Sequence, residues 1–174
     1  MIRKNSSGLY DTLKTDILMG HFAPGSKLKI ETLKLRYRVG VNVIRESLAR
    51  LATEDLVDSE DQKGFRVAEV STSRLSDLTR LRILLEVDGA RYCLEHGEIE
   101  WESNLVAANH QVAYIAEKMR EDEDEHCTIW HQCDWEFHSA LISACNSQLH
   151  RLYHKRVFDQ FRQFVTVDLK TNGF

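Results

Sequence analysis

The sequence predicts a mostly α-helical chain with an N-terminal winged helix-turn-helix over residues 1–70 and a C-terminal all-α helical bundle over residues 71–174. Three observations predict this fold class. Apolar residues recur at helical spacing in three short segments before residue 52. A glycine-containing turn with alternating side chains follows at residues 63–67, as in a short hairpin. After residue 70, long helical periodicity continues without strand signals.

The first part is expected to hold three short amphipathic helices. The turn Pro24-Gly25 separates the first helix from the second, and the third falls within residues 39–51. Each helix has one apolar stripe that we expect to face a common core. In order, the stripes are Leu9, Leu13 and Ile17; Ile30, Leu33 and Tyr37; and Val41, Ile44, Leu48 and Leu51.

The third helix has the pattern of a DNA-reading helix. Arg45 cannot share the apolar stripe, and with Asn42 it projects from the N-terminal half, which meets base edges when such a helix enters the major groove. Arg38 and Arg50 lie farther round, where phosphate contact is easier. The alternative is that three short amphipathic helices with surface arginines form any small helical domain.

Charge excludes an indiscriminate nucleic-acid binder. The first 70 residues hold 12 Lys+Arg against 10 Asp+Glu, and the rest hold 11 against 17, so the chain has a net charge of −4. Basic groups must therefore concentrate on one face of the first part to attract a polyanion.

Several separated motifs in the first part resemble the DNA-binding domain of GntR-family transcription regulators. The resemblance implies a homodimer on a short palindromic operator, with Arg45 contacting bases and Lys63-Gly64 as the wing tip in the minor groove. One departure is Val43, where the family usually has proline, a residue suited to a first helical turn. The motifs are the run from Ala23 to Leu28, Gly40-Val41, Ile44 to Leu48, Leu56-Val57 and Lys63 to Val67.

The second part begins at Ser71-Thr72-Ser73, whose side chains can cap a helix. A stripe of Leu75, Leu78, Leu81 and Leu85 predicts a helix that is broken near His96-Gly97, and further helices are predicted at about 98–119, 126–145 and 148–169. The acidic run 121–125 is interpreted as a solvated loop. This part resembles the FCD effector-binding and dimerisation domain of the FadR-type branch. That domain normally continues through at least two more helices, so it is expected to be incomplete here.

Asp134 and His138 are the candidate metal ligands. Their i, i+4 spacing places both on one face of a helix, where a divalent metal such as zinc could pair them. The alternative is a simple hydrogen bond between them. The resemblance implies two ligands from this motif and two later histidines, which this chain does not reach. His150 and His154 could substitute, but the sequence gives no reason to prefer them.

Arg82 is the candidate effector-binding residue, because its segment resembles the first helix of the FCD domain. A guanidinium offers a planar fork that suits a carboxylate. The resemblance implies a small carboxylic acid as effector. The alternative is an ion pair with Glu86, at i, i+4 on an exposed face.

Two other functions remain open at this stage. A metal-dependent enzyme would use Asp134 and His138, with His131 or Glu136 as acid or base, but it explains nothing about residues 24–67. A helical interaction module would have lost DNA binding. We expect a regulator rather than an enzyme. No signal peptide or apolar run of transmembrane length is present, so a cytoplasmic protein without membrane contact is expected. Its four cysteines lack C-x-x-C spacing and are expected to be reduced thiols.

Overall fold

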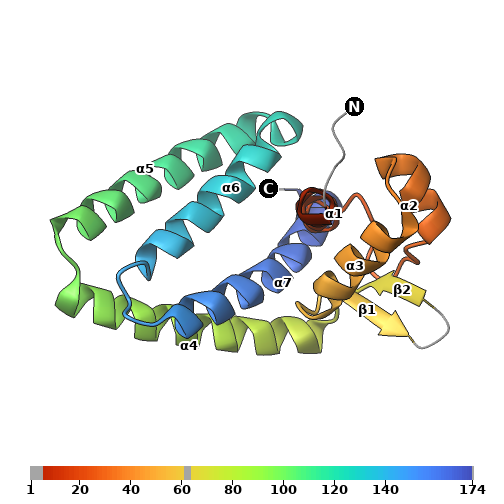
Figure 1. The fold of residues 1–174 in the computed structure, drawn as a ribbon. Coiled ribbons are helices and arrows are strands. Elements are labelled where there is room, and N and C mark those ends of the chain that lie inside the picture. The colour runs from red at the N-terminus through yellow and green to blue at the C-terminus, as the bar shows by residue number, and fades with distance from the viewer. Residues whose placement is uncertain (1–5, 61–63, 174) are drawn as a thin grey trace. The chain divides into compact units, whose positions relative to one another are not determined.

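A computed structural model describes residues 6–60 and 64–173. The chain divides into two compact units. The first contains Met1–Leu75 with Arg162–Val167, and the second contains Ser76–Phe161 with Asp168–Phe174. Figure 1 shows the elements, which are α1 (Ser6–Leu18), α2 (Ile30–Tyr37), α3 (Val41–Ala52), β1 (Val57–Glu60), β2 (Gly64–Val67), α4 (Thr72–His96), α5 (Ile99–Glu121), α6 (Glu123–Leu141) and α7 (Gln148–Asn172).

The core of the first unit lies where α3 packs against α1, α2 and β1. The three predicted stripes face this core, because each helix turns its apolar side inward to remove it from water. Val41, which the sequence placed in the third stripe, is the exception, since it is only partly buried and lies outside this core. Ile30, Tyr37 and Val43 are partly buried against its edge. The fully buried stripe residues are Leu9, Leu13, Ile17, Leu33, Ile44, Leu48 and Leu51.

A small wing follows α3, as the sequence predicts. Strands β1 and β2 pair antiparallel, with Val57 opposite Val67 and Glu60 opposite Gly64. The segment before α2 joins the other edge of β2, since the Leu28 N–H donates to the Phe65 carbonyl at 2.9 Å. Gly64 has a φ of 91°, a conformation that glycine adopts without steric cost. The predicted wing-tip residue Lys63 lies outside the described residues.

The second unit is all α, but two predicted boundaries are wrong. The acidic run is not a loop, because Glu121 ends α5, Asp122 caps α6 and the next residues form the first turn of α6. The Asp122 carboxylate accepts the Glu125 N–H at 3.0 Å, and acidic groups at a helix N-terminus interact favourably with its dipole. Helix α6 also ends at Leu141 instead of Cys145.

The predicted cap before α4 is confirmed, because the Ser71 hydroxyl accepts the Arg74 N–H at 3.2 Å. Helices α5 and α6 pack against each other. Among the described residues, no helix has the length and apolar character needed to cross a membrane.

Candidate functional site

The outward face of α3 carries two of the predicted DNA-binding side chains. Asn42 and Arg45 are exposed on the N-terminal half of the helix, while Ile44 and Ser47 on the opposite side are buried. The Ser47 hydroxyl donates to the Val43 carbonyl at 2.9 Å, which satisfies a polar group that the sequence pattern did not place in the core. Asn42 and Arg45 are therefore not used in packing the core behind α3.

The other predicted DNA contacts are distributed around the first unit. The Arg50 guanidinium lies 3.9 Å from the centre of the Tyr10 ring, so a cation–π contact holds it beside α1. Arg38 is exposed and ends α2 with a left-handed φ of 55°. Gly64 is exposed at the start of β2. The structure thus keeps Arg45 and Asn42 together and places Arg50 toward the other end of the same helix.

A buried polar cluster in the second unit is centred on Glu86 of α4. Its Oε1 atom accepts from Arg82 Nε at 2.8 Å and lies 3.1 Å from His138 Nδ1 and 3.0 Å from His154 Nε2. The Glu86 side chain is only 14% exposed and that of His154 only 1%. Three helices, α4, α6 and α7, therefore direct polar side chains at one carboxylate oxygen.

Aromatic rings enclose the cationic side of this cluster. The Arg82 guanidinium carbon lies 4.7 Å from the Phe158 ring centre and 4.6 Å from the Phe161 ring centre. The Trp135 ring stacks on His154 with centres 5.7 Å apart. These rings fix the direction of the Arg82 fork toward Glu86 and His138.

The electrostatics of the cluster favour charged forms. Burial would raise the pKa of Glu86, but the imidazole of His138 beside it and hydrogen bonds with His154 and Arg82 outweigh burial and hold that pKa well below its usual range. Burial would lower the pKa of His138, but the nearby carboxylates of Asp134 and Glu86 outweigh it and raise that pKa. The negative charge of the Glu86 carboxylate is therefore offset by the basic side chains that surround it within the cluster.

The predicted site residues of this unit come together, with one difference in environment. Arg82 pairs with Glu86, as in the alternative interpretation, but their side chains are only 13% and 14% exposed, so the expected exposed face is wrong. Asp134 Oδ1 lies 3.5 Å from His138 Nε2. Sequence reasoning missed Glu86 as the centre and gave no reason to choose His154, because spacing along one helix does not show which helices converge.

The cluster as arranged does not fit a metal ion. Within residues 6–60 and 64–173, no group of three or more His, Cys, Asp or Glu side chains is placed to hold one. The Arg82 Nη2 atom lies 2.6 Å from His138 Nε2, and a guanidinium there repels a cation. His150 does not join Asp134, because its Nε2 contacts the Leu85 carbonyl at 2.7 Å.

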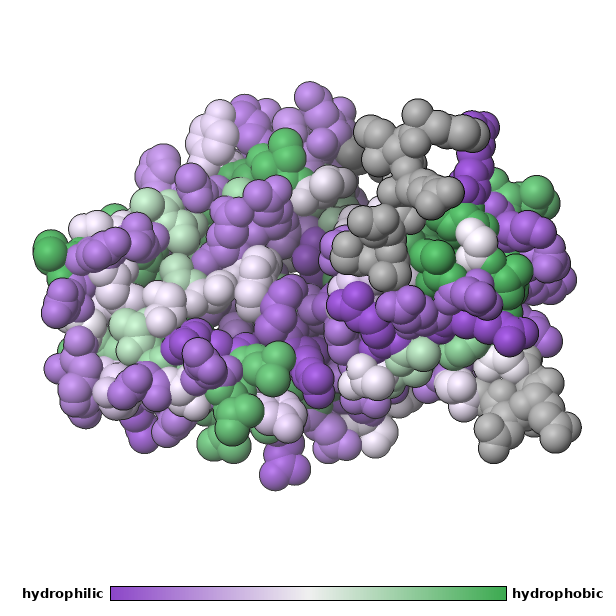
Figure 2. All heavy atoms as spheres, in the orientation of Figure 1, coloured by the Kyte–Doolittle hydropathy of each residue, from purple (hydrophilic) through white to green (hydrophobic). Residues whose placement is uncertain are grey.

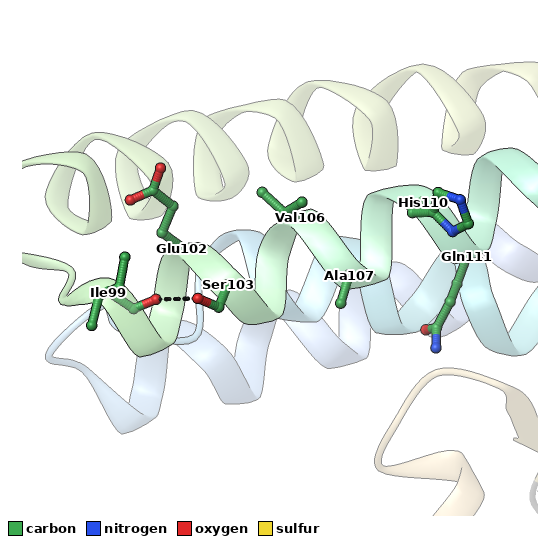
Figure 3. A pocket seen from close by; sticks show the side chains of 7 residues that line it. All are labelled: Ile99, Glu102, Ser103, Val106, Ala107, His110 and Gln111. Carbon is green, nitrogen blue, oxygen red and sulfur yellow. Dashed lines mark hydrogen bonds between the residues drawn. The ribbon is translucent and has the colours of Figure 1, made fainter.

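A shallow groove runs along α5, outside both sets of predicted residues (Figure 3). The Ser103 hydroxyl donates to the Ile99 carbonyl at 2.7 Å within it. All of its lining residues come from one helix, so it offers no converging polar groups. They are Ile99, Glu102, Ser103, Val106, Ala107, His110 and Gln111. On the face drawn in Figure 2, hydrophobic and hydrophilic residues are interspersed.

A winged helix-turn-helix with an open reading face, followed by an all-α unit, defines a DNA-binding transcriptional regulator. Comparison with known families agrees with this class. Residues 5–67 match the family described as bacterial regulatory proteins, gntR family, and residues 77–173 match the FCD domain. The chain belongs to the GntR family of transcriptional regulators, and its FCD domain is consistent with the FadR-type branch.

Relatives support this assignment. The chain is 36% identical over 146 residues to the HTH-type regulator BphR of Paraburkholderia xenovorans, covering 84% of this chain and 60% of that protein. It is 34% identical over 155 residues to the HTH-type transcriptional repressor GlaR of Escherichia coli, covering 86% and 67%. The chain therefore spans about two thirds or less of the length of these relatives. Both relatives are transcriptional regulators, so the comparisons favour a regulator over the alternative hypothesis of a metal-dependent enzyme.

Solved structures share the fold. A GntR regulator from Rhodococcus superposes with a TM-score of 0.74 at 24% identity, covering 93% of this chain and 74% of that chain. E. coli McbR/YncC superposes with a TM-score of 0.76 at 16% identity, covering 99% and 78%.

Proposed function

We propose that this protein represses or activates transcription as a homodimer, which binds a palindromic operator and responds to a small carboxylic acid. In this proposal residues 1–70 bind DNA, and residues 71–174 bind the effector and contribute to dimerisation. The observation that carries it is the face of α3, where Asn42 and Arg45 are exposed and the opposite side is buried in the core. A helix so supported can enter the major groove without losing its packing.

Arg45 and Asn42 are the proposed base contacts. A guanidinium can donate two hydrogen bonds to guanine, and an amide can pair with adenine in the same way. Arg38 and Arg50 are the proposed phosphate contacts, with Arg50 positioned by its contact with Tyr10. Lys63 and Gly64 are the proposed minor-groove contacts of the wing.

The test is a fluorescence-polarisation titration of the DNA upstream of the gene, with a shuffled sequence of equal length as competitor. Arg45→Ala should lower specific affinity by about 1–3 kcal/mol and reduce the preference for the native sequence. Arg91→Ala, which removes an exposed arginine of α4, is the charge-matched control and should retain that preference. Unchanged discrimination by the Arg45→Ala protein contradicts the proposed reading helix.

The effector proposal rests on Arg82. Its guanidinium fork is enclosed by Phe158 and Phe161 and already binds a carboxylate, that of Glu86. A small acid that exchanged with Glu86 would meet the same geometry. It regulates DNA binding only if its affinity differs between the two DNA-binding states.

Trp135 provides the measurement, because its ring stacks on His154 at the cluster. Titration with succinate, acetate and other small acids should change the tryptophan fluorescence of the parent and leave that of Arg82→Ala unchanged. A response of equal size in both proteins removes Arg82 from the proposed site.

Exposed apolar side chains on α4 support the proposed homodimer. Ile83, Leu84, Val87 and Leu94 are between 45% and 75% exposed, and a run of such residues on one helix typically marks an interaction surface. Light scattering should give a dimer mass for the parent and a lower mass for Leu84→Glu. A monomeric parent at micromolar concentration contradicts the proposal.

A further inference from the structure

Two cysteines of the second unit lie in one apolar cluster, although they are far apart in the sequence. Cys93 is in α4 and is fully buried. Cys145 lies in the turn between α6 and α7 and is 4% exposed. Both pack with Ile142 in the same cluster. Neither residue takes part in the polar cluster around Glu86.

The backbone of α4 lies close to the Ile142 side chain, three residues before Cys145. A Cβ atom built on Gly89 would lie 2.7 Å from Ile142 Cγ2, so the two segments touch where α4 has no side chain. Cys93 follows Gly89 by one helical turn, and Cys145 follows Ile142 by three residues. The contact at Gly89 therefore continues at the two cysteines.

The Cys93 side chain also packs against the turn itself, because Ala144 adjoins the cluster that Cys93 forms with Ile142 and Cys145. A disulfide needs Cα atoms about 4.4–6.8 Å apart, so the proposed link requires this separation between the two packed cysteines.

The two thiols differ in reactivity. The Arg151 Nη1 atom donates to the Cys145 carbonyl and lies 3.9 Å from its sulfur. Burial raises the pKa of the Cys93 thiol. Cys145 is 4% exposed and Cys93 is 0% exposed, so Cys145 is the thiol assigned to attack first and Cys93 completes the bond.

We propose that Cys93 and Cys145 form a redox-modification site, which hydrogen peroxide converts into an intramolecular disulfide. The Cys145 thiolate attacks one peroxide oxygen, the O–O bond breaks, and the leaving hydroxide takes a proton to become water. The Cys93 sulfur then attacks the resulting sulfenic acid, which forms the S–S bond, breaks the S–O bond and releases a second water. Two electrons pass from the sulfurs to one peroxide.

The cross-link would join α4 to the turn that leads into α7. Helix α7 carries His150, which contacts the Leu85 carbonyl of α4, and His154, which contacts Glu86. The disulfide would hold these contacts in place and restrict the unfolded chain, so the oxidised protein should unfold at a higher urea concentration than the reduced protein.

The test uses a Cys127→Ser/Cys133→Ser double variant, which keeps only the two proposed cysteines. Both replaced residues are half-buried in α6 and lie outside the cluster of Cys93 and Cys145. After one equivalent of hydrogen peroxide, intact mass spectrometry should show a monomer that has lost two hydrogens, and dithiothreitol should reverse the loss. A double variant that keeps both thiols, or links only between chains, overturns the proposal.

Single variants assign the roles. Cys93→Ala should retain Cys145 as a sulfenic acid that dimedone traps, and Cys145→Ala should give neither the intramolecular disulfide nor a trapped adduct at Cys93. Circular dichroism checks that each variant is folded. If a single variant does not fold, the mass spectrometry of the double variant still tests the disulfide, because that variant replaces neither buried cysteine. Dimedone adducts on Cys93 in Cys145→Ala, at the rate seen for Cys145, contradict the assigned order.

Discussion

Removal of the Glu86 carboxylate should strongly destabilise the second unit. Its Oε1 atom accepts from Arg82 at 2.8 Å and contacts two imidazoles, those of His138 and His154, at 3.1 and 3.0 Å. The side chains of the pair with Arg82 are 13% and 14% exposed, so water compensates little for the loss. Breaking one partner of a buried ion pair costs about 3–5 kcal/mol, because the remaining charge stays desolvated. We expect Glu86→Ala to cost about 3 kcal/mol.

The measurement is urea unfolding followed by tryptophan fluorescence. All three tryptophans, Trp101, Trp130 and Trp135, belong to the second unit, so this signal reports on that unit. Glu136→Ala is the matched control, because the hydrogen bond of this α6 carboxylate with Gln132 is exposed. Its cost should stay within about 0.5 kcal/mol.

A double-mutant cycle tests whether the cluster acts as a unit. Arg82→Ala combined with Glu86→Ala should cost less than the sum of the two single changes, by about 1–3 kcal/mol, because neither charge is then left alone. Strict additivity, or a loss below about 1 kcal/mol for Glu86→Ala, would refute the account of a coupled buried network.

Three further predictions concern other parts of the chain. Burial would raise the pKa of Asp16, but hydrogen bonds from Tyr37 and His21 outweigh it and lower that pKa, so the contribution of Asp16 to stability is present above the unfolded pKa and is lost as pH falls through the folded pKa. Thermal unfolding followed by circular dichroism between about pH 4 and pH 2 should therefore show that the melting temperature of Asp16→Asn falls less steeply with pH than that of the parent. Gly89→Ala should cost about 1–3 kcal/mol in urea unfolding, since its Cβ would lie 2.7 Å from Ile142 Cγ2; an unchanged midpoint would show that this contact relaxes freely. Elemental analysis should find well under one zinc per chain, and His138→Ala should not change it, because the Arg82 guanidinium lies beside that imidazole. A stoichiometric metal lost in His138→Ala would show that Arg82 moves aside.

Much of the first unit could be predicted from the sequence. The stripes of Leu9, Ile44 and Leu48 could be read directly, because helical periodicity and burial are local consequences of the residue order. The outward direction of Arg45 followed from the same periodicity. At residues 121–125 the charge pattern predicted a loop, and this prediction was wrong. Acidic groups are favourable at a helix N-terminus, and α6 begins within this run.

The sequence by itself determined the order of helices, the wing and the family, because these depend on patterns within short segments. It also placed Asp134 one turn before His138, and Arg82 one turn before Glu86. Only the tertiary structure decided that α4, α6 and α7 bring His138 and His154 to the Glu86 carboxylate, and that Cys93 meets the turn at Cys145. The physical reason is that a helix fixes the neighbours on its own face, whereas contacts between helices depend on how their side chains pack, and that packing is set by the whole unit at once.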